Sequence, residues 1–249
     1  MSASPLLNSY SHVEEFSCKI ERARILSVYA DRGEGDYSFS DLWNLRLSHQ
    51  RQFQIARLLR ESGMRTLTDK KILEVGCGDG RWLRLFNHWG ATPENLFGCD
   101  INTDRIAKAR QLNPAIQVEE VSGHGLPYED EQFDIVLQST VFTSILSIPM
   151  KQNLATHMLR VVKPEGCLLW FDFRYDNPKN KSVRGIGRAE LRSLFPGCQV
   201  HMKSIGLLPP LARRVIPVSS LLATILEHIP PLRYAYLARI RKEGTGNGY

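Results

Sequence analysis

Hydrophobic and polar residues follow two different rhythms along the chain, and the rhythm changes near residue 70. Between residues 41 and 60, apolar side chains return at helical spacings (Leu42, Leu45, Leu47, Phe53, Ile55, Leu58, Leu59). From residue 71 onward, short apolar runs of strand length alternate with stretches of helical character. This order predicts a helical N-terminal segment followed by a doubly wound α/β sheet.

The pattern also divides the chain into parts. We expect strands at 71–75, 95–101, 116–121, 133–137, 167–173, 199–204 and 234–241, and helices at 81–89, 103–111, 188–195 and 219–228. Residues 1–66 are expected to form a helical cap, with a charged, glycine-broken loop at 29–37. Residues 67–243 then form the α/β domain, with an insertion at 206–232, and residues 244–249 are expected to be a disordered tail.

One stretch, residues 72–80, organises the rest of the chain. It reads Ile-Leu-Glu-Val-Gly-Cys-Gly-Asp-Gly, so a buried strand breaks into a loop with glycine at 76, 78 and 80. Glycine has no Cβ, so the backbone can take a positive φ and a ligand can approach the main chain closely. Because a helix follows at once, the stretch predicts a ligand-binding turn at the carboxyl end of a strand.

Two classes of ligand use such a turn. A dinucleotide loop requires a third glycine where this chain has Arg81, so the dinucleotide interpretation weakens. With Glu74 two residues before Gly76, the loop resembles the cofactor loop of class I S-adenosylmethionine-dependent methyltransferases. An ordinary strand-to-helix turn is the alternative to any such match.

A carboxylate follows the second expected strand at Asp100, 24 positions after Gly76. This is near the spacing at which an acid binds the ribose hydroxyls of a nucleoside. Asp100 can instead cap the next helix, although Asn102 or Thr103 can also fill that position. In the methyltransferases that the chain resembles, the acid binds ribose and the next residue, here Ile101, covers the adenine.

Two further landmarks carry the resemblance to residue 173. Leu126-Pro127-Tyr128 with Phe133-Asp134-Ile135-Val136 is similar to a signature of the type 11 methyltransferase group, and Arg-Val-Val-Lys-Pro-Glu-Gly at 160–166 is similar to the next landmark. The resemblance implies a Rossmann-like, mostly parallel seven-stranded sheet that binds S-adenosylmethionine. Ser122 stands where many relatives carry an Asp that accepts from the adenine amino group. The implied cofactor-binding residues are Glu74, Gly76, Cys77, Gly78, Gly80, Asp100, Ile101, Ser122, Gly123, His124 and Gln138.

Composition limits the classes of protein. The chain has 249 residues and a net charge of +6, and its five cysteines lack paired spacing, which argues against a disulfide framework or a zinc site. We therefore expect free thiols and no metal. No apolar run reaches the length of a membrane span and the N-terminus has no secretory pattern, so we expect a cytoplasmic protein.

Charge is unevenly distributed. Residues 177–249 hold 12 Lys and Arg against three acids, or +9, so the remaining residues carry −3. A basic C-terminal third is typical of a solvated face, and it also suits an anionic acceptor, a partner or a membrane surface.

Candidate residues for methyl transfer lie on the N-terminal helix and at or after the ends of the expected strands. The sulfonium of the donor is already activated, so a general base is needed only for a hydroxyl or a protonated amine. His49, Asp172 and Tyr175 are the candidate catalytic residues, and His124 is a further candidate whose role in shaping the adenine loop is favoured. Arg174 and Tyr175, just after the fifth expected strand, are candidates for acceptor binding because open α/β sheets bind ligands at that edge.

The insertion supplies the other acceptor candidates. Arg213 and Arg214 follow Pro209-Pro210 and precede an apolar helix, which favours an anionic or lipid-linked acceptor. The alternative is that the helix packs on the core and the arginines are solvated.

Three classes of function are open at this point. The first is a methyltransferase acting on a small-molecule or glycan acceptor in polysaccharide or natural-product biosynthesis. The second, an RNA methyltransferase, is less favoured because Gln138-Ser139-Thr140-Val141 stands where an amino-methylating enzyme has Asp/Asn-Pro-Pro-aromatic. The third is a noncatalytic S-adenosylmethionine-binding protein. Peripheral membrane association fits the pattern, and the oligomeric state is unknown.

Overall fold

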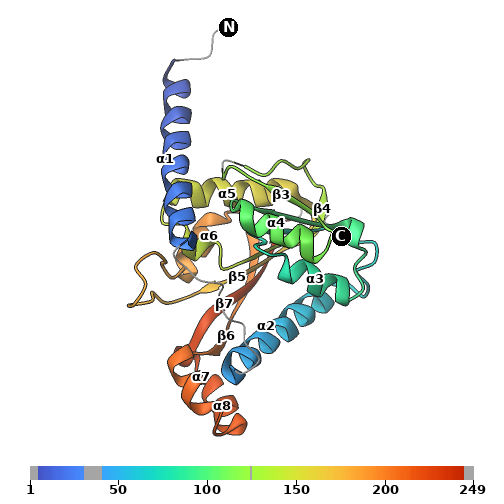
Figure 1. The fold of residues 1–249 in the computed structure, drawn as a ribbon, viewed down its shortest axis with the longest axis vertical. Coiled ribbons are helices and arrows are strands. Elements are labelled where there is room, and N and C mark those ends of the chain that lie inside the picture. The colour runs from blue at the N-terminus through green and yellow to red at the C-terminus, as the bar shows by residue number, and fades with distance from the viewer. Residues whose placement is uncertain (1–4, 31–40, 124, 244–249) are drawn as a thin grey trace.

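Eight α-helices and seven strands make up the described part of the chain, residues 5–30, 41–123 and 125–243 of a computed structural model (Figure 1). The loop expected at 29–37, the tail at 244–249 and His124 lie wholly or largely outside these residues. The strands are β1 (Ile72–Val75), β2 (Leu96–Asp100), β3 (Gln117–Glu120), β4 (Phe133–Ser139), β5 (Val162–Phe173), β6 (Cys198–Leu207) and β7 (Arg233–Lys242). The helices are α1 (Pro5–Ala30), α2 (Leu42–Glu61), α3 (Arg81–His88), α4 (Thr103–Leu112), α5 (Ile148–Val161), α6 (Arg188–Leu194), α7 (Pro209–Val215) and α8 (Ser220–Glu227).

All seven strands form one sheet in the order β3-β2-β1-β4-β5-β7-β6. Strands β1 to β5 run parallel, and β7 runs antiparallel to both β5 and β6. The chain order reverses between β1 and β4, and ligands of open α/β sheets bind at such a switch point. The doubly wound, mostly parallel sheet predicted from the sequence is confirmed.

Both faces of the sheet are covered, which explains why its central strands are apolar throughout. Helices α2, α3 and α4 pack on one face around Leu58, Phe86 and Ile106. On the other face α5 and α6 pack around Met158 and Leu191. Helices therefore cover both faces of the sheet (Figure 1).

The C-terminal half of helix α1 packs against the segment after β4 and the start of α5. Cys18 and Ile25 are buried against Ile145 and Met150. Glu21 accepts hydrogen bonds from Arg24 and from the backbone N–H groups of residues 146 and 147. These contacts join α1 to the segment between β4 and α5. That residues 1–66 act as a cap stays a prediction.

The insertion between β6 and β7 folds into two helices. Ala212 and Ile216 of the α7 segment and Ala223 of α8 are buried against Leu207 and against Leu47 of α2. The helix expected at 219–228 is confirmed as α8, whereas α7 was missed. Its two prolines look like helix breakers, but proline suits the first turn of a helix, where its missing N–H is not needed. None of the helices in the described ranges combines the length and the apolarity needed to cross a bilayer.

Candidate active site

The loop after β1 is shaped by three glycines in the left-handed region. Gly76, Gly78 and Gly80 have φ values of +69°, +55° and +76°. The N–H groups of Gly76 and Cys77 donate to the carbonyl oxygen of Cys99 at 2.8 and 3.0 Å, so the loop is anchored on the end of β2. Residues with a Cβ rarely adopt such angles, which explains the alternate glycines.

Gly76 also faces the turn that follows β4. A Cβ at Gly76 would lie 2.4 Å from Cγ2 of Val141, closer than real contacts allow. Thr140, just before Val141, has a φ of +64°, an uncommon conformation for a residue other than glycine. The two loops of the switch point are therefore in direct contact.

Asp100 joins the glycine loop to the end of β2. Its Oδ2 accepts from the N–H of Gly78 at 2.8 Å and its Oδ1 accepts from the N–H of Asn102 at 2.9 Å. A carboxylate has about four lone-pair directions, so two are left for a ligand's hydroxyl groups. Asn102 caps α4 by accepting from the N–H of Arg105 at 3.0 Å, so the capping role considered for Asp100 falls to Asn102.

Glu74 places a second carboxylate beneath the loop. Its side chain is buried, and its Oε2 has no hydrogen-bond partner. Burial raises the pKa of Glu74 well above its usual value, and the charges of Asp100 and Asp79 raise it further. Burial also raises the pKa of Asp100. A cationic ligand would relieve this crowding of acids, so the loop suits a positively charged group.

Cys77 lies inside this loop as a packing residue. Its side chain is buried, and its Sγ would lie 2.9 Å from a Cβ placed at Gly98. Burial raises the pKa of the Cys77 thiol, which keeps it protonated.

Ile101, one of the residues expected to contact adenine, lies beside the C-terminal half of α1. Ile101 is partly buried against the cluster formed by Cys18, Ile25, Ile145 and Met150, and its carbonyl oxygen accepts from Arg22 at 3.3 Å. Gly123 has a φ of +89°, and a Cβ there would lie 3.9 Å from Cγ2 of Ile101. The adenine contacts expected of Ile101, Ser122 and Gly123 stay predictions.

The side chains of Gln138 and Asp172 accept hydrogen bonds from the turn after β4, and both are fully buried. Oε1 of Gln138 accepts from the N–H of Val141 at 3.1 Å. Asp172 accepts from the N–H groups of Phe142 and Thr143 at 3.1 and 3.3 Å, and burial raises its pKa to about 7. Both carboxylate oxygens of Asp172 thus accept hydrogen bonds from the backbone of the turn. Because the side chain is also fully buried, the structure does not support the predicted catalytic role.

The other predicted acceptor and base residues lie nearer the surface. Tyr175 is partly exposed and its hydroxyl donates to the carbonyl of Pro231 at 2.9 Å. Arg174 stacks over Tyr175 at 4.6 Å and donates to the carbonyl of Pro230 at 2.8 Å. His49 is exposed on α2. These contacts tie the segment after β5 to the insertion.

Arg213 and Arg214 are exposed at the end of α7. The guanidinium of Arg213 lies 4.7 Å from the ring centre of Trp43 on α2. This contact places Arg213 at the junction of α2 and the insertion. The role of Arg213 and Arg214 in acceptor binding stays a prediction.

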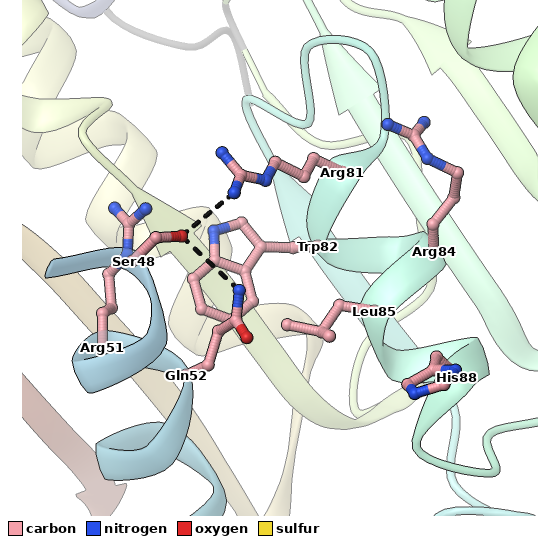
Figure 2. A pocket seen from close by; sticks show the side chains of 8 residues that line it. All are labelled: Ser48, Arg51, Gln52, Arg81, Trp82, Arg84, Leu85 and His88. Carbon is pink, nitrogen blue, oxygen red and sulfur yellow. Dashed lines mark hydrogen bonds between the residues drawn. The ribbon is translucent and has the colours of Figure 1, made fainter. Parts of the chain in front are cut away.

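A pocket that the sequence did not reveal lies between α2 and α3 (Figure 2). Its volume is about 220 Å³, and Arg51, Arg81, Arg84 and His88 contribute cationic or titratable groups to its lining. Arg81 donates to the Ser48 hydroxyl at 3.0 Å. The pocket has no acidic side chain in its lining, so it suits an anionic group.

Arg51 links this pocket to the carboxyl ends of β4 and β5. Its guanidinium lies 4.5 Å from the ring centre of Phe171 and 5.3 Å from that of Trp82, and it donates to the Ser139 hydroxyl at 3.3 Å. Its Nε is buried without a hydrogen-bond partner. In the sequence, Arg51 is one of many polar residues of an amphipathic helix, so only the packing of α2 on the sheet reveals it.

Comparison with known proteins agrees with this geometry. Residues 72–166 match the family described as methyltransferase domain. A fatty-acid O-methyltransferase of Mycolicibacterium smegmatis is 32% identical over 67% of this chain and 62% of its own length. A ubiquinone biosynthesis O-methyltransferase of Pseudomonas fluorescens is 31% identical over 52% of this chain and 55% of its own. The chain spans about half the length of the curated relatives it matches.

A solved structure shows the same fold. The S-adenosylmethionine-dependent methyltransferase from Mesorhizobium loti matches with a TM-score of 0.54 and 16% identity, over 75% of this chain and 96% of that one. The sheet order, the glycine loop and the acid after β2 define a class I methyltransferase fold. Residues 72–166 match a methyltransferase domain, and the fold of the chain is that of the class I methyltransferases.

Proposed function

We propose that the protein transfers the methyl group of S-adenosylmethionine to a small-molecule acceptor that carries an apolar part and an anionic group. The observation that carries the donor assignment is the paired carboxylate geometry. Asp100 is held on the glycine loop by the N–H of Gly78, and Glu74 lies buried beneath the loop with an unpartnered oxygen. One acid suits ribose hydroxyls, and the other suits a cation.

The donor supplies an activated methyl group, so the task of the chain's residues is alignment and exclusion of water. Gly76 and Gly78 let the main chain approach the donor, and Asp100 orients its ribose. Gln138 and Asp172 hold the Val141 turn against the loop. Together these residues fix one wall of the site before the acceptor arrives.

The acceptor proposal rests on Arg51 and the pocket beside it. The guanidinium of Arg51 lies near the rings of Trp82 and Phe171 and reaches the end of β4 through Ser139. A carboxylate or phosphate held there would sit against apolar walls formed by Trp82 and Leu85. The two relatives are named as a fatty-acid O-methyltransferase and a ubiquinone biosynthesis O-methyltransferase, which supports an acceptor of this kind. A lipid-linked glycan also has this combination of groups.

A base is required only where the acceptor is a hydroxyl or a protonated amine. His49 and Tyr175 offer groups with exposed surface, whereas the Asp172 carboxylate is buried. We propose Tyr175 as the first candidate to test, because it follows β5 at the ligand-binding edge of the sheet. Asp172 is then a positioning residue.

A methyl-transfer screen tests the proposal. Donor carrying a labelled methyl group would be incubated with fatty acids, hydroxylated aromatic carboxylates, sugar phosphates, lipid-linked glycans and RNA. We expect label in one of the anionic small molecules, a large loss of transfer in Arg51→Ala and little change in the matched control Arg60→Ala, a second arginine of α2 outside the pocket lining. Labelling of RNA alone would contradict the proposed acceptor, and donor binding with no transfer to any acceptor would favour a noncatalytic protein.

A further inference from the structure

The insertion presents an apolar surface to solvent. Five large apolar side chains of residues 218–229 are exposed: Val218 by 84%, Leu221 by 72%, Ile225 by 55%, Leu222 by 46% and Ile229 by 44%. Single exposed apolar residues are ordinary on a protein surface, but five within twelve positions form a patch that is costly in water. We call this set the α8 patch.

The α8 patch is the outward side of a well-anchored helix. Ala223 is fully buried, and Leu226 packs against the cluster of Leu47, Leu207 and Ala212. Ser219 caps the helix by accepting from the N–H of Leu222 at 3.2 Å. Since α8 already buries one side in the protein, the apolar residues on its other side are not needed for folding.

Positive charge adjoins the patch. Arg213 and Arg214 are exposed in the last turn of α7, a few residues before Val218. The acid of the α8 helix, Glu227, lies 3.5 Å from Arg46 of α2 and also accepts from Gln50 at 3.0 Å. The ion pair neutralises Glu227, so the exposed charge beside the patch is positive. Apolar side chains flanked by arginine match the interface of an anionic lipid bilayer.

The position of the patch relates it to the site. The insertion begins and ends beside the carboxyl end of β5, because Phe173 pairs with Ala235 and Leu207 pairs with Arg233. Arg174 and Tyr175 donate to the carbonyls of Pro230 and Pro231, just after the patch. The segment that directly follows the patch is thus in contact with residues at the ligand-binding edge of the sheet.

We propose that the α8 patch docks the protein on an anionic membrane surface, with Arg213 and Arg214 facing the lipid headgroups. The helices α7 and α8 project at one end of the molecule, at the bottom of Figure 1, where a flat surface can reach them. Docking would leave the carboxyl end of β5 close to the headgroups. This inference is independent of methyl transfer, since lipid binding needs neither donor nor acceptor.

Vesicle co-sedimentation tests the proposal without any substrate. Vesicles of phosphatidylcholine alone and with 30% phosphatidylglycerol, by design about one anionic lipid in three, would be mixed with the full chain. We expect binding to the anionic vesicles, at least about tenfold weaker in Leu221→Ser/Ile225→Ser and about fivefold weaker in Arg214→Glu. The matched control Leu112→Ser removes an exposed leucine at the end of α4 and should bind like wild type.

Two results would overturn the proposal. One is unchanged vesicle binding in Leu221→Ser/Ile225→Ser, with the fold checked by circular dichroism. The other is a concentration-dependent dimer in sedimentation velocity that this double variant abolishes while no vesicle binding occurs, because the patch would then bind a second copy of the chain.

Discussion

The backbone N–H of Gly78 donates to Oδ2 of Asp100 at 2.8 Å, so the glycine loop and the acid after β2 form one hydrogen-bonded unit. The acid has two roles as a result. It orders the loop in the free protein, and its remaining lone pairs are available to a ligand. Removing Asp100 therefore changes both the stability of the loop and its affinity for the donor.

The contact between Gly76 and Val141 predicts a specific mutational pattern. Gly76→Ala adds a Cβ at a φ of +69° and 2.4 Å from Cγ2 of Val141, whereas the control Gly63→Ala adds one at a φ of +84° with no atom within 4 Å. We expect Gly63→Ala to cost about 1 kcal/mol of the free energy of unfolding, and Gly76→Ala to cost more. Urea denaturation measures both values.

A double variant isolates the clash. Val141→Ala removes Cγ2, so Gly76→Ala/Val141→Ala should cost less than the sum of the two single variants. Additive costs would show that Val141 does not crowd Gly76 in solution.

Glu74 predicts proton release when the donor binds. Burial, with the charges of Asp100 and Asp79, raises the pKa of Glu74, so its carboxyl ionises at a higher pH than an ordinary glutamate. A nearby cation favours the ionised form and lowers that pKa, so binding of the positively charged donor should release protons. Calorimetric titrations in two buffers of different ionisation enthalpy measure the number released.

The control for this experiment is Glu74→Gln, which cannot ionise at this position. We expect proton release in the wild type and little in the variant. Equal release from both proteins would mean that another group titrates on binding.

Asp172 predicts a pH dependence of stability. Its pKa rises from 3.8 to about 7 on folding, so the native state binds more protons than the unfolded state between these values. The free energy of unfolding therefore falls as pH rises from about 4 to 7, by on the order of 4 kcal/mol for this group. In Asp172→Asn this part of the decline should disappear.

Urea denaturation at several pH values compares the two proteins. Asp104→Asn, which changes an exposed carboxylate in the first turn of α4, is the matched control and should keep the wild-type slope. If Asp172→Asn keeps that slope as well, the Asp172 carboxyl ionises in the native protein as it does in the unfolded chain.

The part of the site that local sequence determines could be predicted. The glycine loop requires φ values that favour glycine, and Asp100 ends a strand beside it, so residue type and spacing were sufficient. The succession of the five parallel strands along the chain could also be predicted, because each strand is a short apolar run.

Features that depend on packing between distant segments could not be predicted. Arg51 lies near Phe171 and Ser139 only after α2 has packed on the sheet, and the helical period does not distinguish it from other polar residues of α2. Arg160 shows the same limit. It donates to the carbonyls of Leu126 and Tyr128 at 2.7 Å and so joins the motif at 126–128 to the motif that begins at Arg160.

Calorimetric titration with S-adenosylhomocysteine tests the central claim most directly, because it measures donor-site binding without any acceptor. We predict one binding site in the wild type and an affinity weaker by about 1 to 3 kcal/mol in Asp100→Ala, since the variant loses the hydrogen bonds to ribose and the anchor of the loop. Asp104→Ala serves as the control and should bind like wild type. No binding to the wild type, or unchanged affinity in Asp100→Ala, would contradict the assignment of this loop as the donor site.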